Sequence, residues 1–375
     1  MSEDDESKPH IIIDNGSKYI KAGFAGEEGP SSVLPACVGY PKYSPGIIGG
    51  INEDYYIGQD AENKNGVLKL NYPIENRIIN NWDDMEKIWA HIFVEELRVA
   101  PEEHNVLIDD IQTNPIKNKE KMAEIMFETF NVQGFYIVKQ CQLSLYSQGK
   151  HDGLVVDSGY RITQIVPIMD GYLIPHTDLN ILLGGRDLTI YMIELLKETG
   201  YRFSIINEDE IAKSIKEKAC YVSLDFEDEL KYIEPFDYEL PDGTHVIIKD
   251  ERIRCPEVLF YPSLIGNTGK GLGESCYDSI NKCDIDMRKV LYSTVILSGG
   301  NSMFNGLIER LTKELKALSP ESMKEEVKVI ASPERKYAIW IGGSILSNIS
   351  TFDVMWITKN EYEESGSNIV HKKLL

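Results

Sequence analysis

One pattern occurs twice in this sequence, and the repetition is what most constrains the fold. Residues 11–17 run from three isoleucines through an aspartate into an Asn-Gly-Ser turn, and residues 18–26 form a returning segment. Residues 154–159 repeat the order of apolar residues, aspartate, small polar residue and glycine, and residues 160–168 return. Apolar, β-branched runs bounded by turn residues predict β-hairpins. Two hairpins in matching order predict a duplicated domain.

Both predicted turns have the chemistry of a phosphate site. Turn amides and small hydroxyls form concave nests that bind anions. Asp14 and Asp157 would then lie where a cation on the phosphates needs oxygen ligands, since Mg²⁺ keeps most of its waters and is often held by one or two carboxylates plus phosphate. The alternative is two unrelated hairpins whose aspartates only cap turns. The matching register of the pair favours the phosphate interpretation.

Length, charge and cysteine usage exclude several classes of protein. A chain of 375 residues predicts two domains or one duplicated domain. A net charge of −21 argues against nucleic acid and anionic membranes as partners. Six scattered cysteines without a C-x-x-C pair indicate reduced thiols in a cytoplasmic protein. Residues 1–10 are too polar for a signal peptide, and the uncharged run 337–352 is too short and polar for membrane insertion.

Several helices can be placed from their start signals. Asn81 precedes an acidic first turn and predicts an N-cap. Pro115 predicts a first helical position, and Asn207 predicts the N-cap of a helix that ends near Lys216 and Glu217. Those two residues suit either the helix dipole or a ligand, and the spacing does not decide between these roles.

Glycine pairs mark two further junctions. Gly184 and Gly185 precede a helix with an apolar face, and Gly299 and Gly300 lie between a short apolar strand and a helix. A strand–Gly-Gly–helix junction lets a ligand approach the backbone and a helix N-terminus.

Longer motifs carry a resemblance to a known family. They are residues 82–89 (WDDMEKIW), 126–132 (MFETFNV), 298–300 (SGG), 333–337 (PERKY), 340–346 (WIGGSIL) and 355–359 (MWITK). With these motifs the chain resembles the actin family over essentially its whole length, and conventional actins more closely than most actin-related proteins. The resemblance implies an α/β fold with duplicated actin/Hsp70/sugar-kinase-like domains around a central ATP cleft.

The resemblance also implies domain boundaries. The outer, smaller domain would comprise residues 1–147 and 338–375, with residues 36–72 inserted as a loop subdomain. The inner, larger domain would comprise residues 148–337, with residues 184–267 inserted as a second subdomain.

Site residues follow by position from the same resemblance. Asp14, Gln140 and Asp157 correspond to the family's residues around a hydrated Mg²⁺ or Ca²⁺, and Gln140 to the residue that positions the attacking water. The phosphates of ATP or ADP would be held by Ser17, Lys18, Lys21, Ser158, Gly159, Tyr160 and Arg161. The nucleoside would be held by Gly185, Arg186, Lys216, Glu217, Gly299, Gly300, Met303, Phe304 and Lys336.

Departures from the family pattern fall mostly in this site. Lys18 replaces a glycine, which would cost about 1–2 kcal/mol if the position requires a positive φ. Tyr160-Arg161 replaces Asp-Gly, and Gln164 replaces a histidine near the attacking water, so Gln164 joins Gln140 and Asp157 as a candidate catalytic residue. On the family's phosphate-exit route, Asn114 is kept, but Asn76 and Asn180 replace a histidine and an arginine. We therefore expect ATP binding to be kept and a weak ATPase activity to be impaired or lost.

For function, the resemblance favours a subunit or co-subunit of a cytoskeletal filament. The expected partners are further copies of this chain, conventional actin and actin-binding proteins, with myosin as one candidate. Two features bear on assembly. Loop 41–56 keeps an apolar centre suited to a longitudinal contact, whereas Asn267 replaces a methionine in the lateral plug 264–270, and the loop after Glu229 is about five residues shorter than in conventional actins. A non-polymerising subunit of a larger complex is the alternative, and a small-molecule kinase of the same superfold is a remote one.

Overall fold

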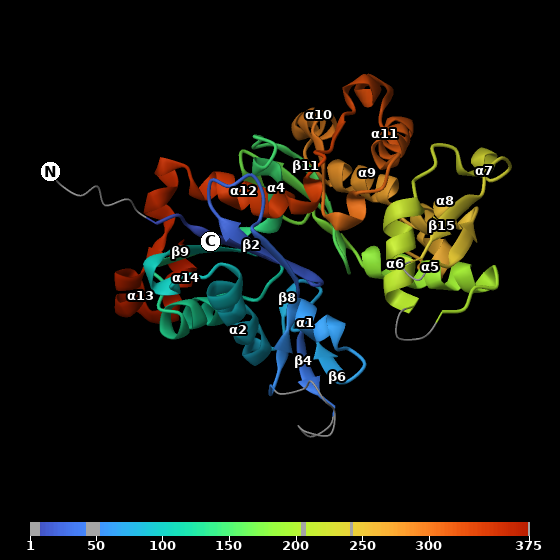
Figure 1. Ribbon diagram of the computed structural model, residues 1–375. Coiled ribbons are helices and arrows are strands. Elements are labelled where there is room, and N and C mark those ends of the chain that lie inside the picture. Colours follow the sequence, from blue (N-terminus) through green and yellow to red (C-terminus); the bar gives the residue numbers. More distant parts are fainter. Residues whose placement is uncertain (1–7, 43–52, 204–207, 241–242, 374–375) are drawn as a thin grey trace. The chain divides into compact units, whose positions relative to one another are not determined.

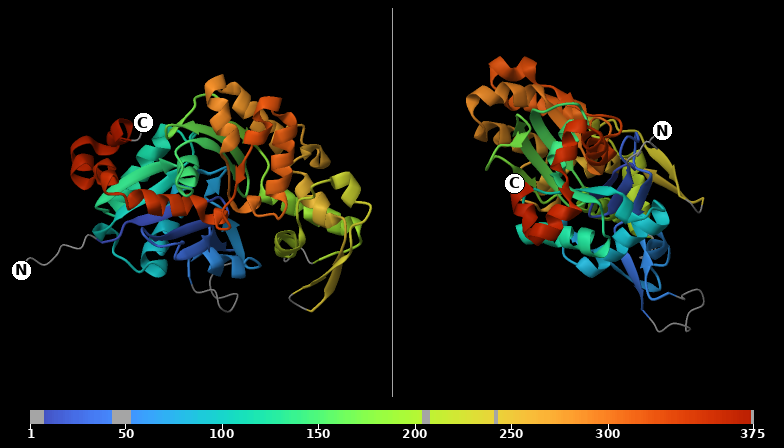
Figure 2. Two further views of the ribbon diagram at one scale, coloured as in Figure 1. Left: turned by 90° about the horizontal axis from the view of Figure 1, so that it is seen from above. Right: turned by 90° about the vertical axis from the view of Figure 1, so that its left-hand side faces the viewer.

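The computed structural model describes residues 8–42, 53–203, 208–240 and 243–373. The chain divides into two compact units, the first formed by residues 1–149 and 337–375 and the second by residues 150–336 (Figure 1). Sheets flanked by helices are seen in two further views (Figure 2). Among the described residues, no helix combines the length and the apolar composition needed to cross a bilayer.

The first unit is built on a six-stranded sheet whose central strand β1 pairs antiparallel with β2 and parallel with β9. All five residues of β1 are buried, as expected for a strand covered on both faces. In sheet order the strands are β19 (Ile357–Thr358), β10 (Gly134–Lys139), β9 (Asn105–Asp110), β1 (Ile11–Asn15), β2 (Tyr19–Phe24) and β3 (Ser32–Pro35).

Alternation along β1 assigns its isoleucines to two different cores. Ile11 and Ile13 pack with residues of α2 (Trp82–His91) and α3 (Ile116–Glu124). Ile12 packs with Leu143 of α4 (Gln140–Tyr146) and Trp340 of α12 (Ala338–Ser347). α4 and α12 lie side by side (Figure 1). Gly342 makes this close packing possible, because a Cβ there would meet the carbonyl oxygen of Leu143 at 1.8 Å.

The remaining elements of the first unit are small. A three-stranded sheet carries α1 (Gly58–Asn63), and its strands are β5 (Tyr56–Ile57), β4 (Val38–Pro41) and β6 (Leu68–Asn71). A hairpin of β7 (Ile74–Glu75) and β8 (Ile78–Ile79) follows. α2 and α3 continue as π-helices over Ile92–Glu96 and Ile125–Thr129, and the chain ends with α13 (Lys359–Ser365) and α14 (Val370–Lys373). Most of the predicted docking loop, residues 43–52, lies outside the described residues.

The second unit repeats the central arrangement of the first. Its strand β11 pairs antiparallel with β12 and parallel with β17, as β1 does with β2 and β9. Both hairpins predicted from the sequence are thereby confirmed. The strands are β13 (Tyr172–Leu173), β12 (Thr163–Met169), β11 (Gly153–Ser158), β17 (Val295–Ser298) and β18 (Val329–Ile330), with β14 (Leu179–Ile181) paired to β12.

Helices and one further hairpin complete the second unit. α5 packs against both α6 and α8. The helices are α5 (Gly185–Glu198), α6 (Glu208–Ala219), α7 (Phe226–Glu229), α8 (Glu251–Glu257), α9 (Leu272–Lys282), α10 (Ile285–Ser293) and α11 (Leu307–Leu318), and the hairpin is β15 (Phe236–Glu239) with β16 (His245–Ile248). Asn207, the predicted N-cap of α6, lies outside the described residues.

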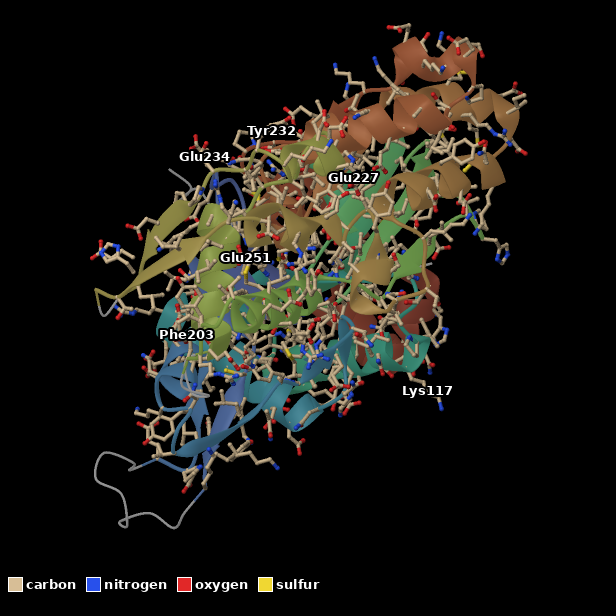
Figure 3. All side chains as sticks on the ribbon, turned by 90° about the vertical axis from the view of Figure 1, so that its right-hand side faces the viewer. Lys117, Phe203, Glu227, Tyr232, Glu234 and Glu251 are labelled. Atoms are coloured by element: carbon tan, nitrogen blue, oxygen red, sulfur yellow. The ribbon has the colours of Figure 1, made fainter. Side chains whose placement is uncertain are left out.

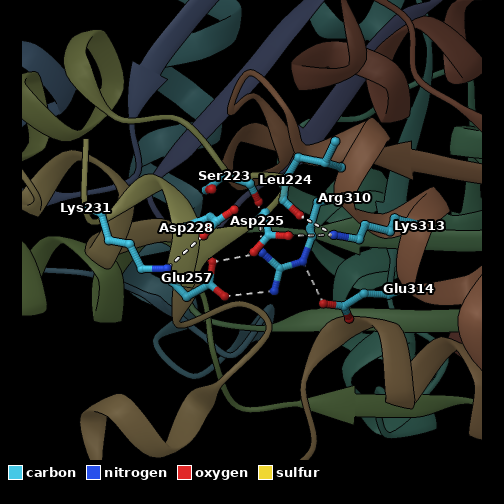
Figure 4. Close-up of polar contacts among 9 residues, drawn as sticks. All are labelled: Ser223, Leu224, Asp225, Asp228, Lys231, Glu257, Arg310, Lys313 and Glu314. Carbon is cyan, nitrogen blue, oxygen red and sulfur yellow. Dashed lines mark hydrogen bonds and ion pairs between the residues drawn. The ribbon is translucent and has the colours of Figure 1, made fainter. Parts of the chain in front are cut away.

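Charged side chains of the second unit occupy two contrasting environments. Tyr232, in the segment between α7 and β15, is 79 % exposed, and the side chains of Glu227 and Glu234 are exposed as well (Figure 3). In the interior, Arg310 of α11 bonds the buried Glu257 of α8 (Figure 4). This buried ion pair ties two helices of the unit together.

Candidate functional site

The first turn site lies at the turn between β1 and β2. Asp14 is only 2 % exposed and lies opposite Lys21 across the strand pair. Lys21 Nζ donates to Asp14 Oδ2 at 2.8 Å. The pair thus joins a buried carboxylate to a half-buried ammonium, and buried charges are normally paired in this way. The structure therefore brings together two residues that the sequence suggested for metal and phosphate binding.

A second carboxylate beside this turn was missed by the sequence reasoning. Asp109 is the second-to-last residue of β9, and its Oδ1 accepts from the backbone N–H of Asn15 at 2.6 Å. Its Oδ2 accepts from Nε2 of Gln140, the first residue of α4. Burial raises the pKa of Asp109 to about 8, and the nearby Asp14 carboxylate adds to the rise. The available signal was the same as for Asp14, an aspartate at the end of an apolar strand.

Arg77 is another residue at this turn that the sequence reasoning did not select. Its backbone N–H donates to Oγ of Ser17 at 3.1 Å. Its guanidinium Nη1 donates to Oε1 of Gln140. Gln140 thus contacts a carboxylate through its amide nitrogen and an arginine through its amide oxygen, the orientation that its donor and acceptor require.

Lys18 is not strained and points to α1. It is absent from the described non-glycine residues with positive φ, so the conditional strain predicted for this position does not arise. Its ammonium pairs with Glu62 of α1 at 2.5 Å and lies 5.2 Å from the ring centroid of Tyr72. The lysine therefore ties the first turn to the small three-stranded sheet.

The second turn site lies between β11 and β12. Asp157 is 2 % exposed and faces Gln164 across the strand pair, in the register that Asp14 and Lys21 have in the first unit. Ser158 Oγ bonds Thr163 Oγ1 at 2.7 Å and accepts from Asn301 Nδ2 at 3.0 Å. Asn301, directly after the Gly-Gly pair, is a further residue that the sequence reasoning left out.

Gly299 packs directly onto this turn. It has φ +88°, and a Cβ there would meet the carbonyl oxygen of Ser158 at 2.2 Å and Asp157 Oδ1 at 2.6 Å. Only glycine fits such a close approach in a left-handed conformation. The predicted strand–glycine–helix junction and the second hairpin turn are therefore one site.

The N-terminus of α5 also meets the second turn. The backbone N–H groups of Gly185 and Arg186 donate to the carbonyls of Gly159 and Tyr160 at 3.0 and 2.7 Å. Lys216 Nζ donates to the carbonyl of Gly185 at 2.6 Å. Burial lowers the pKa of Lys216. This lysine is thus a buried group that orders the start of α5.

The other predicted nucleoside residues differ in exposure. Phe304 is buried in the core of the second unit, whereas Met303 is 38 % exposed. Glu217 and Lys336 are exposed, and Gly300 lies near the stem of Lys336, with its Cβ position 3.9 Å from Lys336 Cγ. Phe304 is therefore a core residue of the second unit, whatever it contributes to nucleoside binding.

A family model for actin matches residues 5–375. The chain belongs to the actin family. Its mixed α/β units accordingly have the actin/Hsp70/sugar-kinase fold. Actin-family proteins generally bind ATP or ADP with a divalent cation, so the turn sites can be tested for their fit to such a ligand.

In this actin-family chain, buried polar atoms at the second turn site fit an anionic ligand with a hydrated cation. Within the described residues, Arg161 Nε and Asn301 Oδ1 are buried without a hydrogen-bond partner in the protein. Buried polar groups are normally satisfied: a phosphate oxygen would accept from Arg161 Nε, and a water of the ligand would donate to Asn301 Oδ1. The described residues contain no group of three His, Cys, Asp or Glu side chains gathered for a metal. Asp14 and Asp157 each present a buried carboxylate at a hairpin turn within its own unit, a group that can accept hydrogen bonds from metal-bound water.

Proposed function

We propose that this actin-family protein binds ATP or ADP with Mg²⁺, or Ca²⁺ in its place, and works as a filament subunit or co-subunit of the cytoskeleton with slowed ATP hydrolysis. The observation that carries the proposal is the buried carboxylate at the end of each central strand, Asp14 in β1 and Asp157 in β11. Both carboxylates adjoin a turn with the small residues that phosphate binding needs.

The residues of the first turn site would have different roles in binding the nucleotide and its cation. Asp14 would accept hydrogen bonds from metal-bound water, and Lys21 and Ser17 would face phosphate oxygens. The cation would supply neutralisation of phosphate charge. Gln140 begins α4 and is 3 % exposed, so its amide has a fixed place beside the first turn, and its ability to orient a water would depend on its oxygen being available.

The second turn site would contribute in a similar way, but with altered groups. Asp157 corresponds to Asp14, Ser158 stands in the place of Asn15 and offers a hydroxyl, and Arg161 adds a cation. Gln164 cannot relay a proton as a histidine would, and positioned acid–base groups are worth about 10²–10⁴-fold in rate. Arg161 could offset part of that loss by stabilising charge on the phosphates. We weigh displacement by the bulky Tyr160 as the larger effect, so slow hydrolysis follows.

A melting experiment tests the nucleotide part of the proposal. ATP at about 100 times its Kd should stabilise the protein by roughly 2.7 kcal/mol, and a chelator should reduce the shift. Asp157→Asn should weaken the ATP-dependent shift, whereas Asp237→Asn, at an exposed ion pair with His245, should leave it unchanged. Melting curves that saturating ATP does not move would refute nucleotide binding.

Sedimentation tests the assembly part. The protein, alone and mixed with conventional actin, is pelleted with ATP, ADP or no nucleotide. Filament function requires that it pellets alone or with conventional actin in a nucleotide-dependent way. Protein that binds ATP but stays in the supernatant in every mixture would instead be a non-polymerising subunit of a larger complex, with partners other than filaments.

A further inference from the structure

The turn between β7 and β8 carries an arginine in an unfavourable backbone conformation. Ile74 pairs with Ile79 and Glu75 with Ile78, so the turn consists of Asn76 and Arg77 alone. Both have positive φ, 48° and 65°. Two-residue turns of this kind favour Asn-Gly, because both central residues need a positive φ and asparagine and glycine adopt it most readily. A glycine at position 77 would relieve the strain, whereas the arginine carries it.

Strained residues persist where the surrounding contacts hold them, and such places are often functional. Here the contacts are specific. The backbone N–H of Arg77 donates to Ser17 Oγ in the first turn site at 3.1 Å, and its guanidinium donates to Gln140 Oε1. Arg77 thus contacts two predicted site residues, Ser17 through its backbone and Gln140 through its side chain.

Gln140 is consequently fixed at both ends of its amide. Its Nε2 donates to Asp109 Oδ2, and its Oε1 accepts from Arg77. The Asp109 carboxylate is itself held by the backbone N–H of Asn15. A planar amide with an acceptor on one side and a cationic donor on the other cannot turn without breaking a charge-assisted bond.

We propose that Arg77 is a positioning residue that holds Gln140 in a conformation unfavourable for activating water, and so sets a slow rate of hydrolysis. This inference rests on the proposed ATPase function. To activate an attacking water, an amide must offer its oxygen as an acceptor. The guanidinium occupies that oxygen, competes with the water for it and makes it a poorer acceptor. Loss of Arg77 should therefore speed hydrolysis and leave ATP affinity almost unchanged.

The test is single-turnover phosphate formation by ATP-loaded protein, with ATP affinity measured separately. Arg77→Gly should raise the rate constant about tenfold, the equivalent of one charge-assisted hydrogen bond, with less than about a twofold change in Kd. Arg77→Lys keeps the charge without the planar fork and should lie between wild type and Arg77→Gly. The glycine variant should fold, since glycine suits this turn.

Two controls separate positioning from structural effects. Arg98 also has a positive φ, 55°, but its side chain is exposed and donates to the nearby carbonyl of Glu95. Arg98→Gly should relieve comparable strain without changing the rate. In a Gln140→Ala background, Arg77→Gly should no longer accelerate hydrolysis, because Arg77 acts through Gln140.

Three results would overturn the proposed role of Arg77. ATP-bound Arg77→Gly that hydrolyses at the wild-type rate or more slowly overturns the inference and leaves nucleotide binding intact. Acceleration that persists in the Gln140→Ala background also overturns it. Wild-type protein that binds no ATP overturns the proposed function and this inference together.

Discussion

Gln164 Nε2 donates to Asn180 Oδ1 at 2.9 Å, and the two residues are direct cross-strand partners on β12 and β14. The resemblance in sequence implies that the family has a histidine and an arginine at these two positions. The two departures therefore form one polar pair within the second unit. Gln164, 2 % exposed, has its amide nitrogen committed to a neighbour in its own sheet.

Restoring the family residues of the second turn site should speed phosphate release. The variant Tyr160→Asp/Arg161→Gly/Gln164→His replaces a fixed amide by an imidazole that can relay a proton, an effect worth up to about 10²–10⁴-fold. Asn180→Ala is the matched control, since it frees Gln164 without supplying a relay group and should not increase the rate. Phosphate release is compared with conventional actin at equal filament load. A wild type that already matches conventional actin contradicts the prediction.

Removing one partner of the buried ion pair between α8 and α11 should lower the free energy of unfolding of the second unit strongly, because the other partner stays buried. Arg310 donates through Nη2 to Glu257 Oε1, through Nε to Glu314 Oε1 and through Nη1 to the carbonyl of Ser223, each at 2.8 Å. Burial raises the pKa of Glu257, and Arg310 opposes the rise. Arg310→Met should cost about 3–5 kcal/mol, because it leaves a buried carboxylate unpaired.

Two comparisons make that prediction specific. Arg310→Met/Glu257→Met should recover most of the loss, since buried ion pairs often exchange for apolar residues at little cost. Lys313→Met, which removes an exposed pair with Asp225 (Figure 4), should cost less than about 1 kcal/mol. Denaturant unfolding measures all three. Equal losses for the single and double variants of the buried pair would contradict this account.

Asp110 should make the first unit less stable as the pH rises through mildly acidic values. It accepts from Asn114 Nδ2 at 2.7 Å and lies 3.6 Å from Lys119 Nζ. Burial nevertheless raises its pKa to about 6. The folded protein thus holds this proton more tightly than the unfolded chain, whose aspartates titrate near 3.9. Stability from this group is present below about pH 4 and is lost as the pH rises to about 6.

Asp110→Asn isolates the effect from the other carboxylates. The unfolding free energy of wild type minus that of Asp110→Asn should fall by on the order of 2–3 kcal/mol between pH 4 and pH 7. Denaturant titrations at several pH values measure it. A difference that stays constant with pH would show that Asp110 titrates normally.

The sequence predicted those parts of the fold that depend on local pattern. The two hairpins follow from apolar runs ending in Asp-turn-Gly order, and Asn81 caps α2 by accepting from the N–H of Asp84 at 3.1 Å. Pro115 also marks a helix start, although it is the N-cap residue and the helix begins at Ile116. These signals act over a few residues, so the sequence contains them in full.

Contacts between distant segments were not predictable in the same way. Asp109 joins the first turn site because β9 pairs with β1, and Arg77 joins it because a tight turn directs its side chain to Gln140. Asn301 is selected only once Gly299 is seen to pack on Ser158. Lys18 was expected to face phosphate, but its ammonium bonds Glu62. Tertiary pairing, more than residue type, determines these four positions.

Assembly should be limited by the segment 264–270. Leu264 is 42 % exposed and belongs to the short 3-10 helix Pro262–Ile265, while Gly266 has φ +73° and ends that helix. Asn267 follows, half-buried, and its Oδ1 accepts from the N–H of Gly269 at 2.8 Å. The loop presents an apolar base with a polar tip whose oxygen is already bonded within the loop.

Asn267→Met should strengthen a lateral contact made by this loop and lower the critical concentration for assembly. Burying an asparagine that lacks a partner costs about 1–3 kcal/mol, and a methionine would add apolar contact. The local bond to Gly269 would be lost, and we expect that loss to be the smaller effect because it involves one exposed neutral hydrogen bond.

The net charge of −21 adds repulsion between protomers, so wild type should assemble poorly or into short filaments alone. It should assemble better at higher salt or divalent-ion concentration, which screens charge, and should enter conventional filaments as a minority subunit. Pelleting across a concentration series gives the critical concentration, with Thr268→Ser, a small change in the same loop, as the control. Wild type that assembles as readily as conventional actin, with no effect of Asn267→Met, would refute a weakened plug.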